Sequence, residues 1–523
     1  MKQDLLDRRS SGVLLHVTSL PGPHGSGDLG PAAHAFASFL ANAGQRWWQM
    51  LPVGPTGSWG SPYDSPSAFA GSPRLIALAP LVAQGLLRED EVAAPKRLQS
   101  CREVDFSAST SFRKPRLRAA FERFERRRSL SLRRQFDAFR QDAGAWLDDY
   151  ALYTALKQAQ GDACWTAWPA GLRDRRAAEL KRARASLAQE IRFIEFEQFQ
   201  FQLQWEQLRR HCHRLGVRLL GDIPIYVAHD GADTWANREL FHLDRLGKRR
   251  VVAGVPPDMF SATGQLWGNP LYRWPVLARG GFRWWIQRFQ TMLKRFDAVR
   301  LDHFIGFSRY WEVEAGARTA QHGRFVPVPG AAFLERAKEE LGSLPMVAED
   351  LGVVTPEVRS LRRRFELPGM NILQFAFGDP TQPSDYQPHR HERNSVVYTG
   401  THDNDTTVGW FRERLSSSAS SEQRAEGRRA LDYADSDGRA PHWDMIRLAL
   451  MSVANTAVFP MQDLLGLGSE ARMNTPGTLD GNWTWRVRDK QLSSALAEHM
   501  AELCGRYERR TAIGSSQGRR RSR

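Results

Sequence analysis

The stretch that decides the fold is residues 298–304, which read AVRLDHF. An apolar run leads directly into Asp302, and two later stretches repeat this change from an apolar run to a carboxylate. The acids are separated by 47 and 54 residues, which is long enough for a strand, a helix and their connections. We therefore expect three parallel strands of one sheet that carry acids at the same edge. The later stretches are VAEDLG at 347–352, with Glu349, and YTGTHDND at 398–405, with Asp403.

Eight apolar runs that end in loop residues recur along the whole chain. Most are continuously apolar, which is typical of strands in a parallel sheet that is covered on both faces. Polar chemistry gathered at the carboxyl ends of eight parallel strands is typical of a (β/α)8 barrel. The predicted fold is therefore α/β, a (β/α)8 TIM barrel. The eight runs are 12–17, 46–52, 217–225, 296–301, 345–348, 370–377, 395–399 and 457–461.

The uneven spacing of these runs predicts two insertions in the barrel. The second and third runs are separated by far more residues than one crossover helix needs, and the intervening sequence has mainly helical periodicity. The segment after the third run is rich in Gly, Pro and Trp, which predicts a loop-rich insertion over the active site. No C-terminal β-domain is expected. The predicted organisation is 1–85 (barrel strands 1 and 2), 86–214 (helical insertion), 215–227 (strand 3), 228–275 (loop-rich insertion), 276–509 (strands 4–8 and a final helix) and 510–523 (disordered basic tail).

The composition describes an ordinary globular chain with an unusual basic excess. It is 41% hydrophobic and 25% charged, and no window holds the 18 apolar residues that a membrane span needs. The N-terminus has no apolar stretch typical of a signal peptide, and the four cysteines show no disulfide pattern, so we expect a cytoplasmic protein. The net charge is +15, but arginines alternate with acids and apolar residues as on solvated helix faces. Nucleic-acid binding is therefore not favoured.

The three acids suit the cleavage of a glycosidic bond, in which one carboxylate attacks and another transfers a proton. Arg300 lies two positions before Asp302 on the same face of its strand, and its charge should lower the pKa of this potential nucleophile. Glu349 ends an apolar run, where partial desolvation should raise its pKa and suit an acid and base. Asp403, beside His402, could accept hydrogen bonds from sugar hydroxyls. For any one of these acids, a helix cap or a surface ion pair is the alternative.

Residues 254–270 add a second sugar-binding pattern. Apolar sugar faces lie flat on aromatic rings such as Trp267, and side chains such as Asp258 and Gln265 can bridge pairs of hydroxyls. A plain structural loop is the alternative. We expect no metal site here, because His211 and His213 are two residues apart on a predicted helix and do not converge.

Taken in order, these segments resemble the 4-alpha-glucanotransferases of glycoside hydrolase family 77, the amylomaltases or disproportionating enzymes. The resemblance runs from about Ser11 to Arg486, nearly the whole chain. It departs from the usual family pattern at Asp64, Ile305 and Phe325, which puts the acceptor and chain-length preferences in doubt. Besides the three acid segments and the 254–274 loop, the motifs are SLPG at 19–22, SPYDSPSAF at 61–69, GDIPI at 221–225 and EARMNTPG at 470–477.

The resemblance implies transfer of α-1,4-glucan segments to another glucan or to glucose, without cofactor or metal. It makes Asp302 the nucleophile of a retaining double displacement, Glu349 the acid and base, and Asp403 the transition-state stabiliser. It also implies a protein that is a monomer or a small homo-oligomer. The alternatives are a hydrolytic α-amylase-type enzyme and a non-catalytic glucan- or nucleic-acid-binding protein. The implied substrate-binding residues are Tyr63, Asp222, Asp258, Gln265, Trp267, Arg300, His402 and Asn474.

Overall fold

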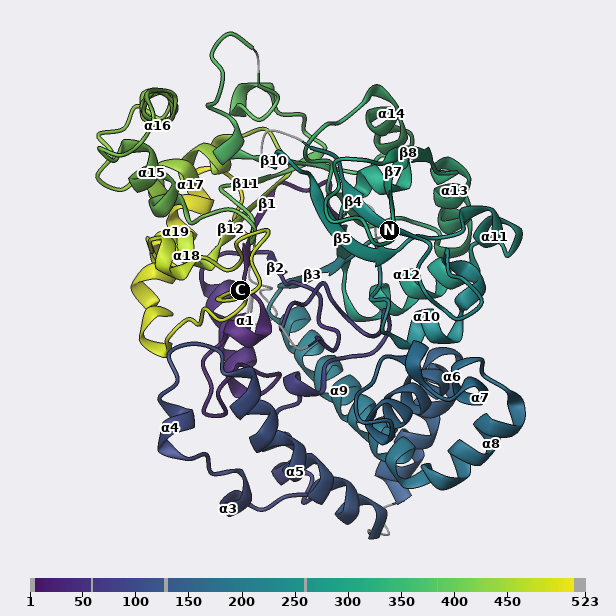
Figure 1. Ribbon diagram of the computed structural model, residues 1–523. Coiled ribbons are helices and arrows are strands. Elements are labelled where there is room, and N and C mark those ends of the chain that lie inside the picture. Colours follow the sequence, from purple (N-terminus) through teal and green to yellow (C-terminus); the bar gives the residue numbers. More distant parts are fainter. Residues whose placement is uncertain (1–4, 58–59, 127–129, 258–260, 383, 512–523) are drawn as a thin grey trace, which may run out of the picture.

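The computed structural model describes residues 5–57, 60–126, 130–257, 261–382 and 384–511. Eight parallel strands form one sheet in the order β10-β11-β12-β1-β2-β3-β6-β9 (Figure 1). The amide of Ala348, in β9, donates to the carbonyl of Pro368, just before β10, at 2.8 Å. This bond joins the last strand of this order to the first. The predicted (β/α)8 barrel is confirmed. The strands are β1 (Ser10–Leu14), β2 (Trp47–Gln49), β3 (Arg218–Ile223), β6 (Ala298–Leu301), β9 (Met346–Ala348), β10 (Gly369–Ile372), β11 (Ser395–Tyr398) and β12 (Thr456–Pro460).

The strands are apolar throughout because both of their faces are buried. Alternate side chains, such as Leu14, Leu220 and Val347, pack together in the barrel interior, while their neighbours pack against the surrounding helices. Gly12 lies beside Trp47 across the β1–β2 ladder, and a Cβ on Gly12 would lie 2.4 Å from the Cβ of Trp47. The glycine therefore makes room for a fully buried indole inside the barrel.

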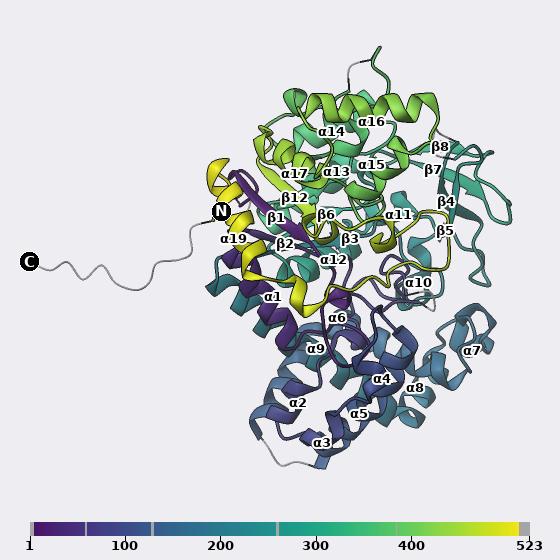
Figure 2. The ribbon, with the colours of Figure 1, turned by 90° about the vertical axis from the view of Figure 1, so that its left-hand side faces the viewer.

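The helices of the barrel cover the outer faces of these strands (Figures 1 and 2). The helix α12 shows why: its apolar side chains, including Trp285 and Phe289, recur on one face and are buried. These helices are α1 (Pro31–Asn42), α12 (Arg283–Arg295), α13 (Gly330–Leu341), α14 (Pro356–Arg364), α15 (Thr407–Leu415), α16 (Ser421–Tyr433), α17 (Pro441–Met451), α18 (Met461–Leu464) and α19 (Ser494–Arg506).

A mainly helical region separates β2 from β3 and lies below the barrel in Figures 1 and 2. Its aromatic residues form a core: Phe196 of α9 lies 5.1 Å from Phe124 and 5.6 Å from Phe121, measured between ring centroids. The end of α9 leads directly into β3, which ties the region to the barrel. The helices are α2 (Ala79–Ala83), α3 (Glu89–Val92), α4 (Lys96–Gln99), α5 (Phe106–Arg126), α6 (Leu130–Ala159), α7 (Ala170–Arg173), α8 (Ala177–Ser186) and α9 (Ala188–Arg214).

The region after β3 contains a second sheet in addition to loops and the helices α10 (Ala232–Ala236) and α11 (Trp274–Arg279). Four antiparallel strands pair in the order β5-β4-β7-β8 and lie at one side of the barrel (Figures 1 and 2). The sequence interpretation of 228–275 as loop-rich did not include these strands. They are short, and half of the sheet comes from residues beyond β6. The strands are β4 (Val251–Val255), β5 (Gln265–Pro270), β7 (Arg309–Glu314) and β8 (Arg324–Pro327).

The end of the chain that the structure describes is fixed by a buried arginine. The guanidinium of Arg509 is fully buried and donates to six backbone carbonyls, among them those of Ser10 at 2.9 Å and Ser452 at 2.7 Å. The predicted disordered tail 510–523 lies almost entirely outside the described residues. No helix within the described ranges is long and apolar enough to cross a membrane.

Candidate active site

Asp302 and Glu349 lie at the ends of neighbouring barrel strands. Asp302 directly follows β6 and Glu349 directly follows β9, and these strands are adjacent in the barrel. The amide of Glu349 donates to the carbonyl of Leu301 at 3.1 Å, and the amide of Phe304 donates back to the carbonyl of Glu349 at 3.0 Å. These backbone bonds fix the two acids at the same edge of the barrel, as the sequence predicted.

His303 directly follows Asp302 and holds the Glu349 side chain through its own backbone amide. His303 has a φ of 50°, in the left-handed region, and its amide donates to Oε2 of Glu349. A left-handed non-glycine residue is unfavourable unless its surroundings hold it, so this turn is consistent with a functional constraint. Burial also lowers the pKa of the His303 imidazole to about 4, so the ring is neutral at physiological pH.

Arg300 joins Asp302 to a second, deeper acid. One guanidinium nitrogen donates to Oδ1 of Asp302 at 2.8 Å, and the other donates to Oδ2 of Asp222 at 2.5 Å. Arg300 and Asp222 are buried, whereas the Asp302 side chain is 26% exposed. The Tyr63 hydroxyl also donates to Oδ2 of Asp222, at 2.8 Å. Arg300 is therefore held from behind by Asp222 and presents its free edge to Asp302.

The electrostatic environment of Glu349 differs from that of Asp302. Burial raises the pKa of Glu349 well above its usual value, and the nearby charge of Asp302 acts in the same direction, against the attraction of Arg300. Burial likewise raises the pKa of Asp222 to about 7, opposed by Arg300 and assisted by Asp302. A protonated Glu349 beside an arginine-paired Asp302 is the arrangement that an acid and a nucleophile need.

Asp403 lies on the loop after β11 and is held by the segment that contains Asn474. Asn474 Nδ2 donates to Oδ1 of Asp403 at 2.6 Å, and Nε2 of His402 lies 3.3 Å from Oδ2. The Arg472 guanidinium donates to the backbone carbonyls of Asp403 and Asn474, at 2.7 and 2.8 Å. Asp403 keeps 44% of its side chain exposed, so it is fixed in place while remaining open to a ligand.

Aromatic rings form a wall between Asp222 and Asp403. The ring of Tyr63 stacks on the imidazole of His402, with centroids 5.1 Å apart and planes inclined by 12°. Trp483 packs against both rings, at 5.8 and 5.9 Å. Burial lowers the pKa of His402, so the stack is neutral, although the charge of Asp403 opposes this shift.

Trp267 lies on the strand β5 of the four-stranded sheet. Its ring meets the ring of His303 edge-on, with centroids 4.8 Å apart, and lies 6.1 Å from Tyr226. Its indole Nε1 donates to the side-chain oxygen of Gln265 at 3.2 Å, and its side chain is 38% exposed. The structure thus brings Trp267 to His303, the residue after Asp302, with Gln265 hydrogen-bonded to the indole. Asp258 lies outside the described residues.

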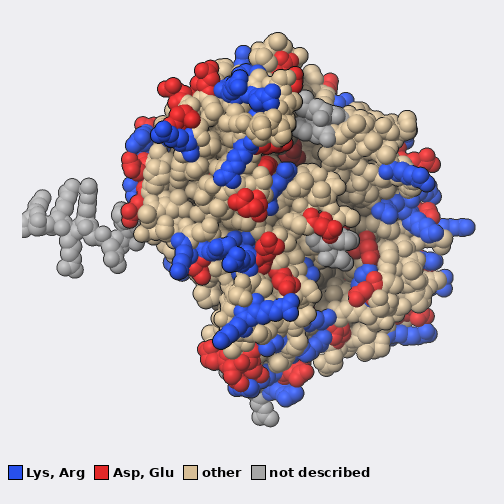
Figure 3. Space-filling view, turned by 60° about the vertical axis from the view of Figure 1, so that its left-hand side comes forward, with Lys and Arg blue, Asp and Glu red and all other residues tan. Residues whose placement is uncertain are grey.

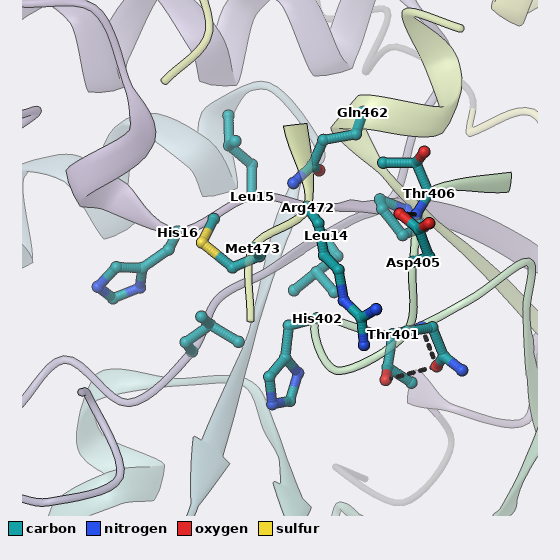
Figure 4. A pocket seen from close by; sticks show the side chains of 13 residues that line it. Leu14, Leu15, His16, Thr401, His402, Asp405, Thr406, Gln462, Arg472 and Met473 are labelled. Carbon is teal, nitrogen blue, oxygen red and sulfur yellow. Dashed lines mark hydrogen bonds between the residues drawn. The ribbon is translucent and has the colours of Figure 1, made fainter. Parts of the chain in front are cut away.

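A small pocket behind His402 contains residues that the sequence analysis did not single out (Figure 4). His16, at the end of the first barrel strand, is buried there, and burial lowers its pKa to about 4. Figure 4 also shows Arg472 reaching the loop that carries Thr401 and His402. Arg472 could have been found because it lies two residues before Asn474 in a motif already noted, whereas nothing near His16 suggested a role. Among the described residues, no cluster of His, Cys, Asp and Glu could hold a metal ion.

A (β/α)8 barrel that presents an arginine-paired aspartate, a buried glutamate and a third carboxylate at one edge of its sheet defines an enzyme that acts on glycosidic bonds. Comparisons with known proteins specify the family. Residues 15–492 match the family model Glyco_hydro_77, described as 4-alpha-glucanotransferase. The chain belongs to this family, and the sequence resemblance is confirmed.

Named relatives cover nearly the full length of the chain. It is 48% identical to a 4-alpha-glucanotransferase of Thermus thermophilus over 497 residues, covering 95% of this chain and 97% of the relative. It is 45% identical to a 4-alpha-glucanotransferase of Synechocystis over 512 residues, covering 97% and 99%. Among solved structures, an amylomaltase from Streptococcus agalactiae in complex with acarbose matches with a TM-score of 0.91 and 36% identity, covering 96% of this chain and all of that one. These relatives identify the chain as an enzyme of the glucanotransferase class.

Proposed function

We propose that this protein transfers α-1,4-glucan segments from a donor glucan to an acceptor glucan or to glucose, by a retaining double displacement through a covalent glycosyl-Asp302 intermediate. The observation that carries the mechanism is the bond from Arg300 to Asp302 beside the buried Glu349. Family membership supports the transfer reaction, and the match to an amylomaltase in complex with acarbose supports a sugar-binding cleft.

In the first step, Asp302 attacks the anomeric carbon while Glu349 gives its proton to the glycosidic oxygen. The bond from the anomeric carbon to that oxygen breaks, and the shortened glucan leaves with the proton. The Arg300 guanidinium binds and orients the Asp302 carboxylate for this attack, and the raised pKa of Glu349 keeps its proton in place beforehand. Asp403 stabilises the positive charge that develops on the sugar ring.

In the second step, Glu349 acts as the base. It takes a proton from a hydroxyl of the acceptor glucan, whose oxygen attacks the anomeric carbon and displaces Asp302. Two inversions at this carbon retain its configuration. The donor sugar would stack on Tyr63 and bond to His402. Asp222 has no exposed surface, so it would not contact the sugar as the sequence implied but would hold Arg300 and Tyr63 in place. On the acceptor side, Trp267 and Gln265 would contact the glucan, with Asn474 holding Asp403.

Incubation with maltotriose alone tests this function. A ladder of longer maltooligosaccharides together with glucose, at a constant total of reducing ends, is the expected result. Glucose and maltose with rising reducing ends would instead indicate a hydrolase of the α-amylase type. No change in the substrate would refute catalysis and leave a glucan-binding protein. A nucleic-acid-binding function has little support, because the basic and acidic side chains on the face in Figure 3 are interspersed rather than gathered into one basic patch.

A further inference from the structure

A groove of about 880 Å³ lies outside the catalytic cleft and is lined by residues of the helices α6, α9, α12 and α13. Phe139 and Trp146, both half-buried on α6, contribute aromatic rings to it. These residues are seven positions apart, which places them two helical turns apart on the same face, about 10 Å along the axis. The volume is that of a ligand site rather than of a packing defect.

The acidic side chains that line the groove are each paired with an arginine or a lysine. Asp142 of α6 is paired with Lys294 of α12 at 2.9 Å, across the groove. Glu206 is paired with Arg210 at 3.6 Å and accepts a hydrogen bond from Gln202 at 2.8 Å. Because these charges are compensated, the groove suits a neutral ligand with many hydroxyls rather than an ion. The other polar residues include Gln135, Gln287, Gln290 and Glu340, the last of which is paired with Arg336.

Arg295 is a buried residue that lines this groove. It is 4% exposed. Arg295 also lines a small cavity that contains Tyr63 and Asp222 of the catalytic site. Arg295 therefore lies between the groove and the catalytic site.

The groove is also joined to the catalytic cleft by packing. Phe69, which ends the segment 61–69 that carries Tyr63, lines the groove and stacks on Trp146, with centroids 6.3 Å apart and planes inclined by 10°. The amide of the preceding residue, Ala68, donates to Asp233 at 2.7 Å, on the segment that follows β3. The segment 61–69 therefore lines the groove through Phe69 and the catalytic site through Tyr63.

We propose that this groove is a second binding site for α-1,4-glucan chains, which holds a long substrate at a distance from the reacting bond. Phe139 and Trp146 provide surfaces for the apolar sugar faces, and the surrounding amides bind the hydroxyls. The inference rests on the proposed function, because it takes the same substrate class. A short substrate such as maltotriose fills only the cleft and does not need the groove.

The test places an arginine in the groove. Ala145 is exposed and lines it, so Ala145→Arg should obstruct it without removing a core side chain. Gly144→Arg is the matched control, because the neighbouring position is not part of the lining and a Cβ there meets nothing within 4 Å. Gln290→Ala, at an exposed position, is a second variant that should fold normally. Each variant is compared with the wild type for its melting temperature, its kinetics on maltotriose and on amylose, and its retardation in native gels that contain amylose.

For Ala145→Arg we expect about tenfold weaker retardation by amylose and about tenfold higher KM for amylose. Its kinetics on maltotriose should stay within about twofold of the wild type, and Gln290→Ala should weaken amylose binding about threefold. Equal retardation of Ala145→Arg and Gly144→Arg would overturn the inference. A change in sedimentation without a change in amylose binding would also overturn it, and would make the groove an interface between copies. Failure of the wild type to disproportionate maltotriose would instead refute the proposed function.

Discussion

Replacement of Arg300 by glutamine should affect stability and catalysis by separable routes. Asp222 has no exposed surface, and its Oδ1 has no hydrogen-bond partner among the described residues, so loss of the guanidinium leaves a buried carboxylate with only the Tyr63 hydroxyl. Removing one partner of a buried pair costs about 3–5 kcal/mol of unfolding free energy. For a chain of 523 residues this corresponds to a melting temperature about 3–5 °C lower.

The same change removes the cation that faces Asp302, and kcat should fall by about 10²-fold or more. The double variant Asp222→Asn/Arg300→Gln has no buried charge at these positions, so most of the stability should return. Activity should not return, because Asp302 still has no cationic partner.

Thermal unfolding and the initial rate of glucose release from maltotriose measure the two effects. The control is Arg182→Gln, which breaks a surface pair with Glu179 in which the arginine side chain is 75% exposed, and it should change the unfolding free energy by less than about 0.5 kcal/mol. Recovery of both stability and kcat in the double variant would refute the reasoning. Arg300 would then act only by neutralising Asp222.

Four further perturbations test other parts of the site and fold. Asp302→Asn should abolish transfer and hydrolysis while the circular dichroism spectrum stays that of the wild type; substantial turnover by the folded variant would remove its assignment as nucleophile. Because the pKa of Glu349 is raised and its protonated form gives the first proton, kcat/KM should fall as the pH rises above that pKa, and Glu349→Gln should lose this dependence together with most of the activity. Trp267→Ala should raise the ratio of hydrolysis to transfer on maltotriose, measured as reducing ends against glucose; a constant ratio with lower rates would mean that the ring only binds glucan. Arg509→Met should lower the unfolding free energy by about 3 kcal/mol in urea unfolding, because six carbonyls lose their donor, with little change in KM.

The barrel could be predicted because each of its strands leaves a local signal. A strand buried on both faces must be apolar at every position, so runs such as 296–301 and 395–399 stand out without knowledge of their neighbours. The sheet β5-β4-β7-β8 leaves no such signal. Trp311 of β7 pairs with Gly254 of β4, a partner far away in the sequence, and Phe325 of β8 is largely exposed. Such a sheet is specified by pairing across the fold, which no window of sequence contains.

The positions of the proposed catalytic acids could be predicted for a related reason. Asp302 and Glu349 end apolar runs, and the barrel then brings the strand ends together. The parts of the site that could not be predicted act through the backbone or through packing. His303 holds Glu349 by its amide, and the left-handed turn that aims this amide has no side-chain signature. Trp483 reaches Tyr63 from a segment hundreds of residues away, and only the folded chain shows that the two rings meet.

In the proposed mechanism, the choice between transfer and hydrolysis depends on what surrounds the glycosyl-Asp302 intermediate. The strands that carry the carboxylates and the strand that carries Trp267 are held in the fold in different ways. The carboxylates Asp302 and Glu349 follow the barrel strands β6 and β9, which pair with each other, and backbone bonds at the strand ends fix them further. The strand β6 also pairs with β3, and β9 is bonded through Ala348 to Pro368, next to β10. Trp267 lies on β5, an edge strand whose only paired strand among the described residues is β4, through a ladder with a shift between Val252 and Gly254. An edge strand that is hydrogen-bonded through one irregular ladder changes its position more easily than a barrel strand. Substitutions in β4 and β5 should therefore change which molecule attacks the intermediate, whereas the rate of forming it should depend on the barrel.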